Sequence, residues 1–162
     1  MQDLVDQLAA QLHRKNLTLV TAESCTGGLL ASTVTHKPGA SKMFERGFIT
    51  YSNESKTELL GVPEEIIQKY GAVSAETAQL MAEGALKNSR AGLAVSITGI
   101  AGPDGGTEAK PVGLVYFGYA LKGGSSGSIE HTFTGNRQEI QTQAALKAIR
   151  HLLSVLADEE LK

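Results

Sequence analysis

The segment Ala22-Glu23-Ser24-Cys25-Thr26-Gly27-Gly28 most constrains how this chain can fold. An apolar run with the composition of a strand precedes it, and an apolar segment with helical spacing begins after it at Leu29. A strand that enters a helix through a short turn of hydroxyl and glycine residues leaves backbone N–H groups at the positive end of that helix. Such a turn favours a bound anion or a developing oxyanion. The segment therefore predicts an active-site turn.

Ser24 is the candidate nucleophile of this turn, and the candidate donors of an oxyanion hole are Thr26, Gly27 and Gly28. The turn is neither a nucleotide P-loop, which needs a lysine after its second glycine, nor the G-x-S-x-G elbow of esterases. In the alternative interpretation, a hydroxyl only caps the helix and the glycines make room for packing. The sequence leaves these two interpretations open.

Two neighbours of Ser24 have other expected roles. Cys25 is a rival nucleophile, but no histidine lies near it in the sequence, and an unassisted thiol is commonly only packed. Glu23 is expected to have a supporting role, either orienting a lysine or capping a backbone group.

Hydrophobic periodicity divides the chain into helices and strands. Helices are expected over residues 2–15, 26–36, 53–60, 63–70, 75–88 and from 136 onward, and strands over 17–22, 47–51, 91–97, 113–121 and 129–134. Asn53, Ser74 and Asn136 are the expected N-caps, the last in a capping box with Glu139. Strands separated by helices indicate a three-layer α/β/α fold with a mixed, mostly parallel sheet of about five strands. No linker or repeat interrupts residues 1–162, so a single domain is expected.

Lys56 lies where the start of a helix disfavours a cation. If Asn53 is the N-cap, Lys56 occupies the third helical position, close to the positive end of the helix. The same field, combined with partial burial, lowers the pKa of a lysine and makes the amine a better general base. The alternative is a solvated lysine that is tolerated at a slight cost.

Arg137 follows the expected cap Asn136, so it too lies at a positive helix end. An arginine beside free backbone N–H groups is explained if an anion such as a phosphate fills the gap. An exposed arginine paired with a nearby acid explains the pattern equally. The loop 99–106 contains Gly99, Gly102 and Gly105, whose conformational freedom lets a backbone approach a ligand closely. Otherwise this loop is only a mobile connection.

The composition limits the partners of the chain. A net charge of −2 and a pI near 6.1 give no broad basic surface, so neither nucleic acid nor a membrane is expected as a partner. One cysteine excludes an internal disulfide, no Cys/His spacing resembles a zinc site, and no metal is expected. The N-terminal residues show neither a signal peptide nor a membrane span, so the cytoplasm is the expected compartment.

Four motifs, in this order and at this spacing, resemble the CinA C-terminal domain family. They are AESCTGG at 22–28, TYSNESK at 50–56, GAVS at 71–74 and SITGIAGPDGG at 96–106. The segments 110–113 and 133–137 also resemble the family, so the likeness covers essentially the whole chain. Any one of these motifs is weak evidence for the family, but four of them in the same order and at the same spacing are specific to it.

The resemblance implies a metal-independent enzyme without a cofactor. Its small-molecule substrate is nicotinamide mononucleotide, which such an enzyme hydrolyses to nicotinate mononucleotide and ammonia in pyridine-nucleotide recycling. The family's serine and lysine fall on Ser24 and Lys56. Arg137 and the glycines of the 99–106 loop are then the candidates for phosphate and ribose contacts. The candidates for ring or amide contacts are Tyr51, Asn53 and Thr98.

Several alternatives stay open beside this resemblance. Some members keep the fold without activity, so one alternative is an inactive nucleotide-binding relative, and another is an amidase or esterase with a different substrate. Ser24 either forms an acyl intermediate or only positions a water molecule. A homodimer is expected, because the Ala- and Gly-rich helix 75–88 suits close packing against a second copy.

Overall fold

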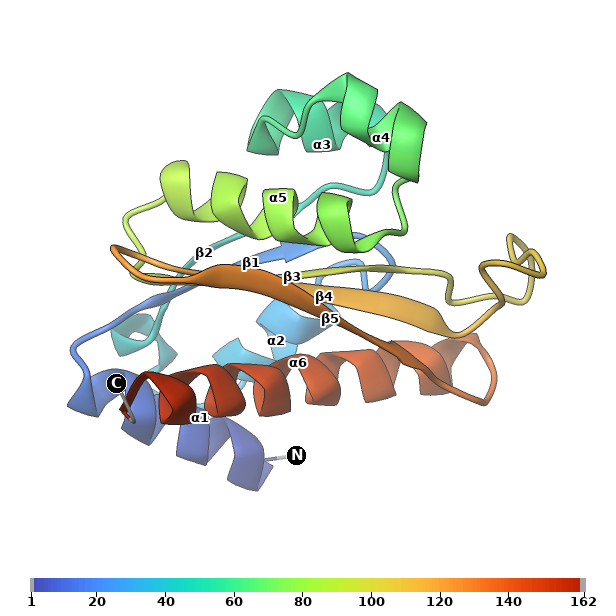
Figure 1. The fold of residues 1–162 in the computed structure, drawn as a ribbon. Coiled ribbons are helices and arrows are strands. Elements are labelled where there is room, and N and C mark those ends of the chain that lie inside the picture. Colours follow the sequence, from blue (N-terminus) through green and yellow to red (C-terminus); the bar gives the residue numbers. More distant parts are fainter. Residues whose placement is uncertain (1, 161–162) are drawn as a thin grey trace.

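A five-stranded mixed sheet in the order β2-β1-β3-β4-β5 forms the middle layer of the fold (Figure 1). The computed structural model describes residues 2–160. Its strands are β1 (Leu19–Glu23), β2 (Phe44–Ile49), β3 (Leu93–Gly99), β4 (Leu114–Leu121) and β5 (Ser126–Thr132). β1 pairs in parallel with both β2 and β3, whereas β3–β4 and β4–β5 are antiparallel pairs. The sheet is therefore mixed, and only β4 opposes the common strand direction.

Helices cover both faces of this sheet (Figure 1). One face carries α1 (Gln2–Arg14), α2 (Leu29–Thr35) and α6 (Arg137–Glu160). The other face carries α5 (Ala75–Lys87), and on its outer side pack α3 (Asn53–Leu60) and α4 (Glu64–Tyr70). A short 3₁₀ helix, Ala40–Lys42, precedes β2. This arrangement confirms the α/β/α fold that the sequence predicts.

β1 is buried along its whole length, because it has strands on both sides and helices on both faces. Its side chains alternate between two apolar clusters. Leu19 belongs to the cluster formed with α1, α2 and α6, and Val20 and Ala22 belong to the cluster beneath α5. The strand therefore leads out of the centre of the core directly into the turn at Ser24.

α5 packs closely against α3 on one side and against β4 on the other, because small residues lie at both contacts. A Cβ atom added at Gly84 would lie 1.8 Å from the carbonyl oxygen of Leu60 in α3. One added to Gly118 of β4 would lie 2.1 Å from the carbonyl oxygen of Ala78 in α5. The small residues of helix 75–88 are thus used inside this chain. The homodimer expected through this helix stays a prediction, without support from its packing.

The cap of α3 is Ser52, and the sequence expectation of Asn53 is wrong by one residue. Ser52 has an extended backbone (φ −82°, ψ 159°), and its hydroxyl accepts the N–H of Ser55 at 3.1 Å. Asn53 is therefore the first helical residue, and Lys56 is the fourth instead of the third. The lysine still lies in the first turn, where the helix end is positive.

Two other predicted helix caps are confirmed, and two strands begin earlier than predicted. Ser74 caps α5, and Asn136 and Glu139 form the predicted capping box at the start of α6. β2 and β5 each begin three residues before the predicted start. In β5 the early residues Ser126 and Gly127 have low strand propensity, but their pairing with β4 overrides it.

We expect Gly84→Ala to destabilise the protein, although alanine normally favours a helix over glycine by about 1 kcal/mol. The new methyl group would overlap the backbone carbonyl of Leu60, and relieving such overpacking typically costs about 1–3 kcal/mol. Urea denaturation should show a lower unfolding midpoint. Gly124→Ala is the control, because its nearest neighbour is the tip of the Leu121 side chain at 3.0 Å. An unchanged or higher midpoint for Gly84→Ala would contradict the close packing of α3 on α5.

Candidate active site

The candidate active site lies at the edge of the sheet where the parallel strands β1, β2 and β3 end. Ser24 follows β1, Tyr51 follows β2, and Thr98 and Gly99 close β3. A pocket of about 260 Å³ opens there. It is lined by Ser24, Cys25, Tyr51, Asn53, Lys56, Ala72, Val73, Thr98, Gly99, Ile100, Ala101, Gly102, Asp104, Gly105 and Arg137.

Ser24 and Lys56 meet in this pocket although they are 32 positions apart in the chain. The distance between Lys56 Nζ and Ser24 Oγ is 3.1 Å. The same Nζ lies 2.8 Å from the carbonyl oxygen of Thr50 and 3.3 Å from that of Tyr51. A neutral amine can donate its N–H groups to these carbonyls and direct its lone pair to the Ser24 hydroxyl.

The surroundings of Lys56 favour this neutral form. Lys56 is only 1% exposed, and burial lowers its pKa from 10.5 to about 8, while Cys25 acts in the opposite direction. The nearest acceptors are backbone carbonyls and a hydroxyl instead of a carboxylate. A substantial fraction of the amine is therefore unprotonated at mildly alkaline pH, as a general base requires.

Glu23 caps α2 from inside the core. Its carboxylate is fully buried and accepts the Thr26 hydroxyl at 2.7 Å and the N–H groups of Leu30 at 2.8 Å and Ala31 at 3.0 Å. Of the two supporting roles expected for Glu23, the structure shows capping. The sequence predicts an external anion at this helix end, but the chain's own carboxylate occupies part of it.

The three predicted oxyanion donors, Thr26, Gly27 and Gly28, form the turn behind the pocket and do not line it. Gly27 donates its N–H to the Ser24 carbonyl oxygen at 3.1 Å. Gly28 is the N-cap of α2 with a φ of 104°, a conformation that favours glycine. Their role as oxyanion donors stays a prediction.

Cys25 shares the pocket with Ser24 but lacks a base of its own. Burial raises the pKa of its thiol to about 12, so the thiol is protonated at neutral pH. The thiolate is the nucleophilic form of cysteine. Ser24, with the amine of Lys56 beside it, is the better equipped of the two nucleophiles.

Arg137 connects three segments at the mouth of the pocket. Its Nη1 donates to the Gly102 carbonyl oxygen at 2.7 Å, and its Nη2 donates to the Tyr51 hydroxyl at 3.0 Å. Because Arg137 is the first residue of α6, these bonds tie the 99–106 loop and Tyr51, in the segment between β2 and α3, to the start of that helix. Its hydrogen-bond partners are thus a carbonyl and a hydroxyl, whereas the alternative interpretation of the sequence expected a nearby acid.

The seven residues predicted to contact substrate all line the pocket: Tyr51, Asn53, Thr98, Gly99, Gly102, Gly105 and Arg137. The sequence analysis did not name five other lining residues, which are Ala72, Val73, Ile100, Ala101 and Asp104. Ala72 and Val73 belong to the motif at 71–74, which is the signal that could have found them. The Thr98 hydroxyl donates to the Ala72 carbonyl oxygen at 2.8 Å and so holds this segment beside β3.

Residues 2–160 lack the features of two other classes of site. No group of three or more His, Cys, Asp or Glu side chains is arranged to hold a metal ion within this part of the chain. Within the same residues, no helix has the length and apolar character needed to cross a membrane.

Comparison with known proteins assigns the chain to a family. The profile described as "CinA C-terminal domain" matches residues 1–156. The chain therefore belongs to the CinA C-terminal domain family. A solved structure from Agrobacterium tumefaciens, the competence/damage inducible protein CihA, is 41% identical with a TM-score of 0.91, covering 94% of this chain and 93% of that one.

Sequence relatives differ in length and in name. The Escherichia coli protein named nicotinamide-nucleotide amidohydrolase PncC is 47% identical over 94% of this chain and 92% of its own length. A Caldicellulosiruptor bescii protein named as a competence-damage inducible protein is 51% identical over 92% of this chain. This chain spans only 37% of the length of that second relative.

We expect Glu23→Gln to lower the free energy of unfolding by about 1–3 kcal/mol. In the wild type, both carboxylate oxygens accept backbone N–H groups of α2. The amide of glutamine has the same shape, but its NH2 group cannot accept a hydrogen bond, so one backbone N–H loses its acceptor. Urea denaturation monitored by circular dichroism measures the change. Glu58→Gln, on the exposed side of α3, is the matched control. Equal midpoints for the two variants would show that the buried cap does not stabilise the fold.

Proposed function

We propose that this protein is a hydrolase that converts nicotinamide mononucleotide and water to nicotinate mononucleotide and ammonia. The contact of 3.1 Å between Lys56 Nζ and Ser24 Oγ carries the proposal, because it pairs a hydroxyl with a buried amine of lowered pKa. The choice of substrate is supported by the name of the Escherichia coli relative, nicotinamide-nucleotide amidohydrolase.

The first half of the reaction acylates Ser24. Neutral Lys56 takes the hydroxyl proton while Ser24 Oγ forms a bond to the carboxamide carbon, and the carbonyl oxygen becomes an oxyanion. Protonated Lys56 then gives its proton to the amide nitrogen. The C–N bond breaks, ammonia leaves, and the nicotinoyl group stays on Ser24 as an ester.

The second half of the reaction releases the acid. Lys56, neutral again, takes a proton from a water molecule that attacks the ester carbon. The proton returns to Ser24 Oγ as the ester bond breaks, which restores the hydroxyl and frees nicotinate mononucleotide. Both halves use one base, whose protonation state alternates.

The oxyanion and the phosphate need donors that the chain supplies from its backbone and from Arg137. We assign the oxyanion to N–H groups of the turn around Thr26, where each well-placed donor contributes roughly 3–4 kcal/mol. We assign the phosphate to Arg137, whose guanidinium can bind two oxygens at once. The glycines of the 99–106 loop lie beside Arg137 and suit contacts with the ribose.

We place this reaction in the cytoplasm, in pyridine-nucleotide recycling, without a metal ion, nucleic acid or membrane as a partner. A net charge of −2 supports the absence of a nucleic-acid role. Every proton transfer in the scheme uses groups of the chain, the substrate or water.

Ser24→Ala and Lys56→Met should each lower kcat on nicotinamide mononucleotide by at least about 10³-fold, because nucleophile and base act as one unit. Cys25→Ala is the control and should keep most of the activity. Release of ammonia measures turnover. In the wild type, kcat/KM should rise with pH and level off above the Lys56 pKa of about 8, since only the neutral amine accepts the proton.

Near-wild-type turnover of either dyad variant, with folding verified by circular dichroism, would contradict the dyad. A protein that binds the mononucleotide without releasing ammonia would instead be a nucleotide-binding relative. Turnover of other small amides or esters, but not of the mononucleotide, would reject the substrate.

Arg137→Ala should raise KM for the mononucleotide, with little effect on the unphosphorylated riboside, because only the former has a phosphate. Arg137 also bonds to the Tyr51 hydroxyl, so Tyr51→Phe is the matched control that removes this bond and keeps the guanidinium. An equal loss on both substrates in Arg137→Ala would assign the arginine to loop positioning instead.

A further inference from the structure

Two segments that resemble the family, 71–74 and 110–113, have no part in the proposed reaction, yet they meet in the structure. Lys110, the first residue of the second segment, donates from its Nζ to the Tyr70 carbonyl oxygen at 2.6 Å. The same amine lies against Gly71, the first residue of the other segment. A Cβ atom added to Gly71 would lie 2.7 Å from it. The contact therefore needs a lysine in one segment and a glycine in the other.

This contact places a cation at the C-terminal end of a helix, because Tyr70 is the last residue of α4. The last carbonyl groups of a helix lack partners within the helix, and a positive charge beside them is favourable. Gly71 is the C-cap of α4 and has a φ of 90°, which also favours glycine. Within the described residues 2–160, the side chain of Lys110 has no other hydrogen-bond or ion-pair partner.

The end of α4 leads directly into a wall of the active-site pocket, formed by Ala72 and Val73. Three successive carbonyl groups hold this wall. Tyr70 accepts Lys110, Gly71 accepts two hydroxyls at the start of α5, and Ala72 accepts the hydroxyl at the end of β3. In the described part of the chain, the N–H groups of Ala72 and Val73 donate to no other group. They are therefore available to a ligand in the pocket.

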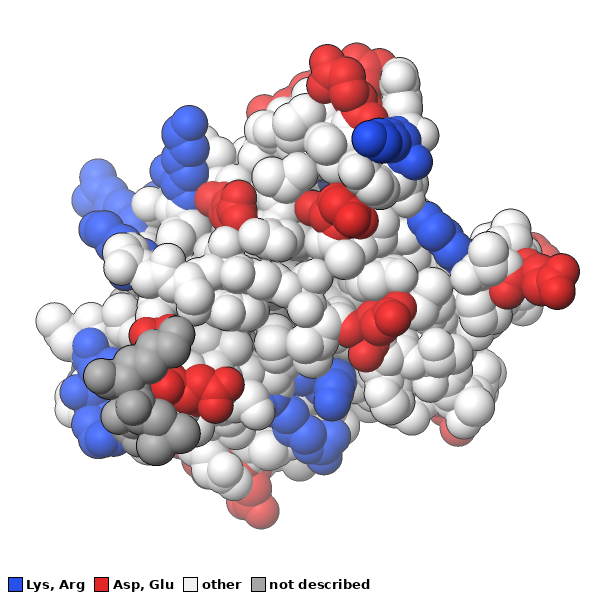
Figure 2. All heavy atoms as spheres, in the orientation of Figure 1, with Lys and Arg blue, Asp and Glu red and all other residues white. Residues whose placement is uncertain are grey.

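The segment 100–113, which carries Lys110, forms another wall of the pocket and is fastened on two sides. Figure 1 shows it projecting beyond the end of the sheet, between β3 and β4. Arg137 ties it to the start of α6 through the Gly102 carbonyl oxygen, and Lys110 ties it to the end of α4. In the same orientation, Figure 2 shows basic side-chain atoms between α4 and this segment. The two ties thus connect helices on opposite faces of the sheet across its end.

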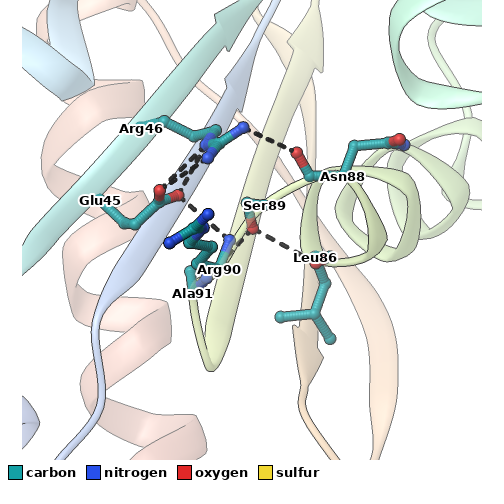
Figure 3. A network of polar contacts seen from close by, with 7 residues as sticks. All are labelled: Glu45, Arg46, Leu86, Asn88, Ser89, Arg90 and Ala91. Carbon is teal, nitrogen blue, oxygen red and sulfur yellow. Dashed lines mark hydrogen bonds and ion pairs between the residues drawn. The ribbon is translucent and has the colours of Figure 1, made fainter.

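A second cation at a helix end provides a comparison outside the pocket (Figure 3). Arg46 donates from Nη1 to the carbonyl oxygen of Asn88, the C-cap of α5, at 3.2 Å. It also forms an ion pair with Glu45 at 2.7 Å. These three residues do not line the pocket, and β2, which carries Arg46, leads toward the pocket only at its other end. Arg46 is therefore the matched control for Lys110.

We propose that Lys110 is a positioning residue of the active site. Lys110 does not itself line the pocket, so it acts by holding the segment 100–113 and the wall at Ala72 and Val73 in place. Ser24 and Lys56 are held by other contacts, so the loss of Lys110 should weaken substrate binding and leave the chemical step nearly unchanged. This kinetic consequence rests on the proposed function, whereas the fastening of the segment does not.

The first test is kinetic and compares variants in the release of ammonia. Lys110→Met should raise KM for nicotinamide mononucleotide at least about fivefold and change kcat less than about twofold. KM for the unphosphorylated riboside should rise by a similar factor, because the wall at Ala72 and Val73 is not the phosphate site. Lys110→Arg keeps a charged donor and should restore most of the loss. Arg46→Met should behave as the wild type.

The second test is limited proteolysis of the ligand-free protein with proteinase K, which needs no turnover. Lys110→Met should be cut within the segment 100–113 at least about fivefold faster than the wild type, because local opening exposes the backbone. Mass spectrometry of the fragments locates the cut. Lys110→Arg and Arg46→Met should be cut there at the rate of the wild type.

An unchanged rate of cleavage in Lys110→Met would overturn the proposal, whether or not the protein turns over the mononucleotide. In an active enzyme, an unchanged KM would also overturn it. A KM that rises for the mononucleotide alone would make Lys110 a phosphate contact instead of a positioning residue. Faster cleavage in a protein whose wild type releases no ammonia would reject the proposed function and support the fastening of the segment by Lys110.

Discussion

The buried carboxylate of Glu23 holds together the turn that presents Ser24 and the first turn of α2. Three donors satisfy its carboxylate, so this negative charge is used within the turn and provides no counter-ion for Lys56. Backbone carbonyls and the Ser24 hydroxyl surround the amine instead, and burial lowers its pKa to about 8. A carboxylate in contact would raise that pKa and keep the amine protonated. The cap of α2 and the basicity of Lys56 are therefore two results of one arrangement.

Backbone hydrogen bonds between neighbouring strands hold Ser24 and Lys56 in this arrangement. The Thr50 N–H donates to the Glu23 carbonyl oxygen at 2.9 Å, and the Thr50 carbonyl oxygen lies 2.8 Å from Lys56 Nζ. Ser24 is fixed in turn by its own N–H, which donates to the Ile97 carbonyl oxygen at 2.9 Å. The register of three parallel strands thus sets the distance between nucleophile and base. Groups held by rigid elements keep such a distance better than groups held by loops.

Local signals at helix starts were enough to predict Ser24 and Lys56 as candidates, because each residue type is unusual or reactive at that position. Their meeting, however, depends on β1 lying between β2 and β3, which no local pattern reveals. The same limit explains the expected anion at α2: the direction of the Glu23 side chain depends on which face of β1 the helix covers. Ser52 and Asn53 are both good caps, and only the backbone conformation where the chain enters α3 decides between them.

The mixed topology of the sheet also explains why helices bury β1 on both faces but cover the edge strand β5 less completely. Parallel neighbours require crossover connections, and those helices bury both faces of β1. β4 and β5 are antiparallel, so the short turn at 122–125 joins them and no crossover helix is needed. Within residues 2–160, no further helix consequently covers the α6 side of β5, and Ile129 stays partly exposed. The antiparallel hairpin that completes the sheet is therefore also what leaves this side of β5 only partly covered.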